Sequence, residues 1–178
     1  VSDDVSTIFD NPAAMGFIKG TQFYLGGSFV SPHVKMTNAV ATHSENIGIL
    51  PVDVTGDASQ SNVVKSAVVP EFYAAMQISP RMHAGISVTV PWGMTSEYDR
   101  NSVVRFMTQK TALKSLNITP MLSFSPLKNL SFAAGIQAQY LTMDLSNFDG
   151  TVMGVPLAPA DQATNLSMDG WGVGYTLG

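Results

Sequence analysis

Hydrophobic and polar residues alternate strictly along residues 82–90. Apolar side chains fall on one parity and small or polar ones on the other: Met82, Ala84, Ile86, Val88 and Val90 against His83, Gly85, Ser87 and Thr89. Successive side chains of a β-strand point to opposite faces. The segment is therefore predicted to form a strand with one apolar face and one small polar face.

The same alternation recurs about six times along the 178 residues. It predicts strands near residues 21–29, 69–78, 82–90, 115–124 and 130–140, and a last one from residue 171. Long connections at 31–67, 94–111 and 146–169 alternate with short turns at 79–81 and 125–129. Pro120 falls inside a predicted strand, where it predicts a β-bulge or an unpaired edge, the bulge being the commoner outcome, because proline donates no ladder hydrogen bond.

Residues 4–18 do not alternate. Asp10 and Asn11 followed by Pro12 are typical of a helix cap with proline at the first helical position. We expect a short helix through residues 13–15, closed by Gly16 and Gly20. The segment is predicted to be a compact plug or cap, not a strand.

Two folds explain the alternation, a soluble β-sandwich and a membrane β-barrel. A sandwich would turn its polar face to water and carry Lys and Glu there. Here that face carries Ser, Thr, Gln, Asn and Gly, with Glu71 and His83 as the main ionisable exceptions. Only 12% of the residues are charged, whereas 45% are hydrophobic. An apolar face, together with connections that are alternately long and short, favours an all-β, antiparallel transmembrane barrel.

A barrel in lipid must close, because unpaired strand edges there are costly. Six strands fall short of the eight in the smallest single-chain bacterial barrels. We therefore expect the chain to be part of a longer protein. Assembly of several chains and a soluble lipid-binding β-sandwich remain the alternatives.

The composition argues against several classes of function. Without cysteine there is no disulfide framework, thiolate metal site or cysteine nucleophile. A net charge of −4 offers no basic stripe for nucleic acid. His33, His43 and His83 show no metal-ligand spacing, and no nucleophile elbow or phosphate loop is present. We expect neither an enzyme nor a bound metal or cofactor.

Several short segments resemble one family in the same order along nearly the whole chain. They are residues 11–15 (NPAAM), 19–22 (KGTQ), 25–28 (LGGS), 69–70 (VP), 90–94 (VPWGM) with Tyr98, 104–106 (VRF), 113–120 (LKSLNITP) and 171–175 (WGVGY). Together they resemble the outer-membrane long-chain fatty acid transporters, the FadL/TodX family. The resemblance implies a fourteen-stranded barrel in the bacterial outer membrane, plugged by a small N-terminal hatch.

The resemblance also implies passive uptake of long-chain fatty acids or other hydrophobic molecules, released sideways into the membrane beside a kinked third strand. On this view residues 1–20 are part of the hatch and residues 21–178 are the first part of the barrel. We expect the complete barrel to be monomeric and surrounded by outer-membrane lipid and lipopolysaccharide. A structural or surface-exposed barrel whose long loops bind a partner is the alternative function.

Arg105 is the charged residue that best suits a fatty acid carboxylate. It lies among apolar neighbours, and the forked donors of a guanidinium match a carboxylate. The alternative is a structural ion pair with Asp10 or Glu97. The remaining candidate ligand contacts are Phe106, Met107, Met94 and Tyr98; thioethers adapt to varied apolar ligands, although each of the methionines and Phe106 also suits ordinary packing.

Pro91, Trp92 and Gly93 are predicted to form the kink, because proline removes a ladder donor and glycine relieves backbone strain. The alternative is an ordinary strand end with Trp92 in the interfacial aromatic belt. Asn11, Pro12 and Ala13 are expected to form a hatch element against the kink, or else a plain helix cap. Lys114 falls on the apolar parity, from which it is expected to extend toward lipopolysaccharide phosphates; the alternative is a surface lysine without a role.

Overall fold

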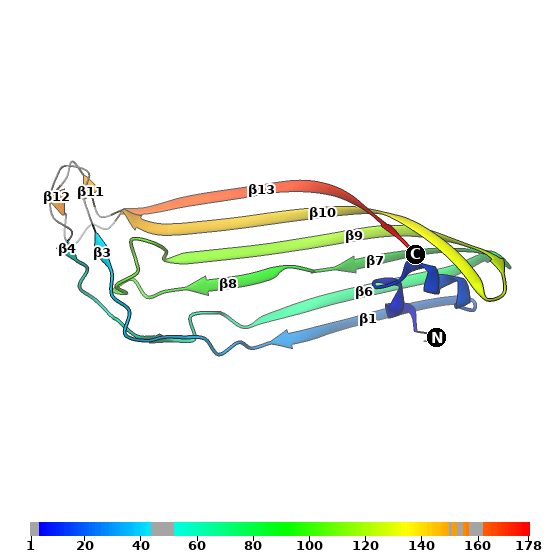
Figure 1. Cartoon of the computed structure of the whole chain (residues 1–178), viewed down its shortest axis with the longest axis horizontal. Helices are drawn as coiled ribbons and strands as arrows, with labels where there is room; N and C mark the ends of the chain where they lie inside the picture. The colour runs from blue at the N-terminus through cyan, green and yellow to red at the C-terminus, as the bar shows by residue number, and fades with distance from the viewer. Residues whose placement is uncertain (1–3, 44–51, 150, 153–154, 157–161) are drawn as a thin grey trace.

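The computed structural model describes residues 4–43, 52–149, 151–152, 155–156 and 162–178. Its main feature is one antiparallel sheet in the order β1-β6-β7-β9-β10-β13, with β8 also paired to β9 (Figure 1). The strands are β1 (Thr21–Val30), β6 (Ala67–Ser79), β7 (Met82–Thr89), β8 (Gly93–Glu97), β9 (Lys110–Leu127), β10 (Leu130–Asp149) and β13 (Gln162–Leu177). β7 and β8 are two parts of the third strand and both pair with β9. Counted in this way, all six predicted strands are present.

Short two-stranded ribbons lie in the long connections, at the end of the sheet opposite the short turns (Figure 1). They pair β2 (Lys35–Met36) with β5 (Gln60–Ser61), β3 (Thr42–His43) with β4 (Val52–Asp53), and β11 (Thr151–Val152) with β12 (Val155–Pro156). In the part of the chain that the structure describes, no helix is long and apolar enough to cross a membrane.

The two faces of the sheet have the composition that the alternation predicts, and the apolar face is the exposed one. Its large exposed side chains include Phe23, Leu25, Phe29, Met76, Leu122, Phe132, Ile136, Val173 and Tyr175. The small polar row is buried instead, and includes His83, Ser87, Thr89, Ser115, Asn117, Thr119 and Ser123. Among the described residues no second sheet covers the apolar face. The soluble β-sandwich is therefore not the fold of this chain.

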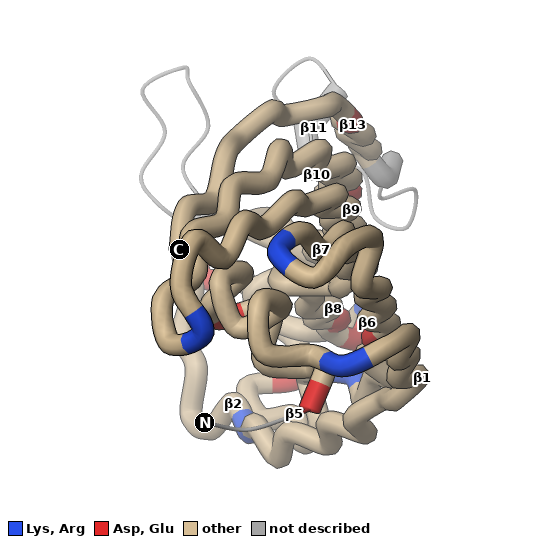
Figure 2. Tube along the Cα trace, turned by 90° about the vertical axis from the view of Figure 1, so that its right-hand side faces the viewer, with Lys and Arg blue, Asp and Glu red and all other residues tan. Residues whose placement is uncertain are grey.

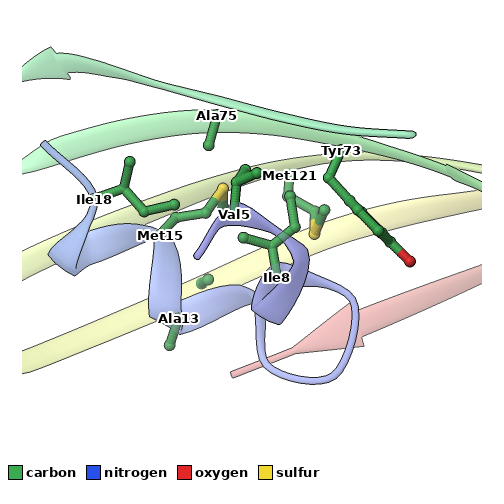
Figure 3. Close-up of a cluster of buried hydrophobic side chains, with 9 residues drawn as sticks. Val5, Ile8, Ala13, Met15, Ile18, Tyr73, Ala75 and Met121 are labelled. Carbon is green, nitrogen blue, oxygen red and sulfur yellow. The ribbon is translucent and has the colours of Figure 1, made fainter. Parts of the chain in front are cut away.

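Residues 4–18, which we call the hatch, pack against the polar face. They form two 3-10 helices, η1 (Val5–Ile8) capped by Asp4 and η2 (Pro12–Phe17) capped by Asn11. Their apolar side chains enter a small core with side chains of the sheet (Figure 3): Val5, Ile8, Ala13, Met15, Ile18, Tyr73, Ala75, Met121 and Ala133. The predicted short helix thus exists, preceded by a second one.

Gly16 lies inside η2 and does not end the helix, which is contrary to the prediction. A Cβ atom at this position would overlap the hydroxyl oxygens of Ser125 and Ser131. Glycine is needed here because the helix backbone approaches the sheet closely. Gly20, with φ +71°, makes the turn that leads into β1.

The last strands are longer than the alternation predicts. β10 and β13 stay paired from Ala134↔Leu177 to Asp149↔Gln162, so much of the predicted loop 146–169 is strand. Of the two outcomes predicted at Pro120, the bulge is absent, and pairing with β10 lapses beside the proline instead. Pairing of β9 with β10 is interrupted between Gly135↔Met121 and Ala138↔Ile118, but the register is the same on both sides.

Candidate functional site

The third strand is broken between β7 and β8. Thr89 is the last β7 residue paired with β9, opposite Asn117, and Gly93 is the first of β8, opposite Lys114. The third strand therefore advances four residues while β9 advances three. One residue too many on one strand is the signature of a β-bulge, which bends the strand and disrupts the ladder.

Ser115 on β9 holds the bulge in place. Its hydroxyl accepts a hydrogen bond from the Trp92 backbone N–H (2.9 Å) and donates one to the Trp92 carbonyl oxygen (2.8 Å). The backbone N–H of Ser115 donates to the same carbonyl oxygen (2.9 Å). The backbone groups of Trp92 that the break withdraws from regular pairing are thus satisfied.

On its other side, the break separates the third strand from β6. Pairing of β6 with β7 ends at Glu71↔Thr89 and resumes only at the bridge Val64↔Ser96. There the Lys65 N–H donates to Thr95 (2.8 Å), and the Lys65 ammonium lies 3.6 Å from the Glu97 carboxylate.

Residues 66–70 and 90–94, all described, have no ladder partner across this gap, which we call the side window. Five residues on each of the two strands border the side window, a length of about 16 Å. Two of its residues, Pro70 and Pro91, have no backbone N–H to leave unpaired.

A cavity of about 600 Å³ lies between the side window and the hatch. Its lining comes from both, and consists of Asp4, Ser6, Phe9, Asp10, Tyr24, Val69, Pro70, Glu71, Tyr73, Thr89, Val90 and Pro91. Three of these side chains are carboxylates, and none is Lys or Arg. The cavity therefore reaches from the hatch to the unpaired segments of β6 and of the third strand.

Tyr73 forms the buried wall of this cavity. Its ring lies 6.3 Å from that of Phe9 in the hatch and 6.0 Å from that of Tyr24 on β1, measured between centroids. Its hydroxyl donates to the Glu71 carboxylate (3.1 Å). Thr89 is only 5% exposed, and its hydroxyl has no hydrogen-bond partner among the described residues. The cavity combines these polar and acidic groups with an apolar side formed by Phe9, Val69, Pro70, Val90 and Pro91.

The predicted ligand residue Arg105 lies away from this cavity, among the long connections. Its Nη1 donates to the carbonyl oxygens of Thr55 (2.8 Å) and Ser102 (3.1 Å), and its guanidinium lies 4.5 Å from the centre of the Phe106 ring. Glu97, one of its two expected ionic partners, forms an ion pair with Lys65. Asp10, the other, lines the cavity at the side window.

The other predicted ligand residues also lie outside the lining of the cavity at the side window. Met107 is 77% exposed and Met94 is also exposed, while the Tyr98 N–H donates to Gln109 (2.8 Å). None of the five predicted ligand residues lines the cavity at the side window. The described residues also contain no cluster of three or more His, Asp or Glu side chains that could hold a metal ion.

Asn11, Pro12 and Ala13 cap and begin η2, where the Asn11 side chain accepts from the Ala13 N–H (3.1 Å). They lie against Gly178, whereas the preceding residues Phe9 and Asp10 face the side window. The sequence analysis did not select Pro70, Tyr73 or Thr89. The sequence does contain a signal for this part of the cavity: Glu71 is one of the two main ionisable residues on the polar face, and it follows Pro70.

Comparisons with known proteins agree with this architecture. The sequence model of the family described as Outer membrane protein transport protein (OMPP1/FadL/TodX) matches residues 1–178. Outer membrane protein P1 of Haemophilus influenzae is 29% identical over 156 aligned residues, covering 85% of this chain and 34% of that protein. The long-chain fatty acid transport protein of Escherichia coli is 24% identical over 196 aligned positions, covering 100% of this chain and 41% of that protein.

Among solved structures, that of a Pseudomonas aeruginosa FadL homologue matches with a TM-score of 0.73. It is 22% identical, and the match covers 98% of this chain and 43% of that chain, so it shows the fold. The chain spans about two fifths or less of the length of these relatives. The chain belongs to the OMPP1/FadL/TodX family of outer-membrane transport proteins, and its sheet is part of an outer-membrane β-barrel.

Proposed function

We propose that the complete protein is a channel for passive uptake of long-chain fatty acids or other hydrophobic molecules, which it releases sideways through the side window. The family and the name of the E. coli relative support the class of cargo. The observation that carries lateral release is the cavity at the side window, because its lining reaches from the hatch to the unpaired strand segments.

The side window is physically suited to stay open in a membrane wall. Backbone groups in lipid must normally be paired, and irregular backbone is tolerated where it lines a cavity. Pro70 and Pro91 carry no donor, and Ser115 satisfies both backbone groups of Trp92. Val69, Pro70, Val90 and Pro91 give the cavity an apolar side next to the unpaired segments. Passage through such an opening needs no covalent chemistry.

The decisive experiment links the two sides of the window. Because the 178 residues contain no cysteine, Val69→Cys with Pro91→Cys adds one thiol on each side for a short bifunctional thiol reagent. We expect the linked protein, inserted in outer membranes, to lose fatty acid uptake about tenfold, as an obstructed path requires. Uptake is measured with a labelled long-chain fatty acid.

The matched control is Phe72→Cys with Val88→Cys, which links opposite residues of the paired part of the same two strands. That link leaves the side window untouched, so uptake should stay normal. Complete linkage of residues 69 and 91 with undiminished uptake would show that the cargo leaves by another route.

We further propose that Arg105 binds the carboxylate of a fatty acid, with Phe106, Met107, Met94 and Tyr98 contacting its hydrocarbon part. The position of Arg105 among the long connections, over the Phe106 ring, supports a role at the entrance. Its bonds to Thr55 and Ser102 offer a purely structural role instead. Arg105→Ala should weaken fatty acid binding about tenfold and spare a neutral hydrocarbon. Equal losses for both ligands would assign Arg105 to loop structure, and Arg100→Ala controls for charge.

Lys114 supports a proposed contact with lipopolysaccharide. It is exposed, belongs to the outward row of β9 and lies opposite Thr142, two pairs beyond Leu116 and Tyr140 of the same face. From there a lysine side chain extends past the apolar band toward phosphates. We propose a monomeric barrel, in which the outward apolar row contacts lipid.

A further inference from the structure

A second cavity, of about 570 Å³, lies on the other side of the hatch, at the end of the sheet where the short turns lie. Its lining residues are Gly16, Phe17, Ile18, Lys19, Gln77, Pro80, Arg81, His83, Ser125, Pro126, Leu127 and Lys128. It shares no lining residue with the cavity at the side window. The path proposed for hydrophobic cargo therefore leaves this cavity without a role.

The charge around this cavity is entirely positive. Lys19, Arg81 and Lys128 line it, and no Asp or Glu does. None of the three has a carboxylate within ion-pair distance among the described residues. All three are exposed, on a chain whose net charge is −4. Figure 2 looks onto this end of the protein and shows basic positions toward the viewer.

Buried polar atoms without partners gather at the floor of the same cavity. His83 is 2% exposed; its Nε2 donates to the Ile18 carbonyl oxygen (3.0 Å), while Nδ1 has no partner among the described residues. The hydroxyl of Ser125, which also lines the cavity, is unpartnered too. Behind them lie Ser123, opposite His83 on β9, and Ser131, beside Gly16, with the same property.

The grouping of these unpartnered buried polar atoms needs a physical explanation. Buried polar groups in folded proteins are nearly always hydrogen-bonded to protein, ordered water or a ligand. Only two other buried side-chain atoms of the described residues are unpartnered, on Thr89 and Asn117. Three cations without an ion-pair partner among the described residues line the same cavity as these atoms, and together they match a group with several negatively charged oxygens. Arginine and lysine bind such groups through short, charge-assisted hydrogen bonds.

We propose that this cavity is a binding site for an oxyanion, the carboxylate or phosphate group of a small molecule or lipid head group. Lys19, Arg81 and Lys128 supply the charge, and Ser125 and His83 supply the buried polar contacts, directly or through water. The volume holds such a group together with a short attached chain. The proposal is independent of the side window, because the hatch separates the two cavities.

The test measures anion binding to the complete protein in neutral detergent. The probes are inorganic phosphate, octanoate and, in nanodiscs, phosphatidylglycerol. The triple variant K19Q/R81Q/K128Q should bind at least one probe about tenfold more weakly than the wild type. The control K35Q/R100Q/K110Q removes the same charge at the opposite end and should change affinity by no more than about twofold, since distant exposed charges are screened.

The pattern across probes names the source of the anion. Loss of phosphate binding identifies a free phosphate, loss of octanoate binding a carboxylate, and loss of phosphatidylglycerol binding alone a lipid head group. Ser125→Ala should weaken the same probe about threefold, as loss of one hydrogen bond does. If no probe binds saturably, or if both triple variants bind equally, the proposal is wrong.

Discussion

Gly85 on β7 determines how closely the hatch approaches the sheet. A Cβ atom at this position would overlap the Sδ of Met15 and lie 3.1 Å from the carbonyl oxygen of Ala74. Met15 is fully buried, so it has little room to move, and the Ala74 backbone has none. A missing methyl group on the polar face thus lets a long hatch side chain fill the core.

Gly85→Ala is therefore expected to weaken hatch docking, by about 1–3 kcal/mol as overpacked cores do. Amide hydrogen exchange of residues 5–18 measures this, and should become faster. The control is Gly170→Ala on β13, where an added Cβ meets nothing within 4 Å. Equal exchange in the two variants would mean that Met15 repacks without cost.

At the scale of elements, alternation predicts the strands where their two faces meet different surroundings. In β10 the alternation continues past residue 140 with the two faces exchanged, since Leu141, Met143 and Leu145 alternate with Thr142, Asp144 and Ser146, and pairing with β13 continues to Asp149↔Gln162. The outward side chains beyond this level are polar and bond each other, as the Ser167 hydroxyl does to Asp144 (2.7 Å). The apolar residues change faces at this level, so a search for one continuous apolar row ends the strand too early.

The candidate site shows the same limit. Pro91 and Gly93 mark the break within one strand, which local sequence can reveal. The side window also needs the register with β6, which places unpaired residues 66–70 opposite unpaired residues 90–94. The contacts of Arg105 with Thr55 likewise join segments fifty residues apart. Such pairings depend on the tertiary structure and leave no periodic signal.

The Ser115 hydroxyl makes two of the three hydrogen bonds that join Ser115 to Trp92 at the break. Ser115→Ala removes both side-chain hydrogen bonds to Trp92 and should cost about 1 kcal/mol or more. We expect faster amide exchange at residues 90–94 and unchanged exchange in the paired part of β7. Ser115→Thr keeps the hydroxyl and should behave like the wild type. Equal exchange in the alanine and threonine variants would show that Pro91 alone maintains the bulge.

For the whole molecule, the outward side chains define a band that fits a membrane. Tyr140 and Trp171 are opposite each other, with ring centroids 5.1 Å apart, and Trp92, 62% exposed, bonds to Ser115 at a neighbouring level of β9. Aromatic residues gather at membrane interfaces. Between this level and the short turns the outward row is apolar, as in Ile136 and Val173. We therefore expect the membrane to lie between the aromatic level and the turns, with the side window at its aromatic edge, because Trp92 belongs to residues 90–94.

This placement predicts that two neighbouring substitutions on β10 lower the free energy of unfolding to very different extents. Ile136, 64% exposed, faces outward in the band, so Ile136→Lys should lower the free energy of unfolding in bilayers by about 2–4 kcal/mol. Gln137 lies at the same height on the opposite face, where Gln137→Lys adds the same charge without contacting lipid, and should cost far less. Urea unfolding of the complete protein in phospholipid vesicles measures both values. If Gln137→Lys proves the more costly, the apolar row faces the interior and the assignment of the two faces is reversed.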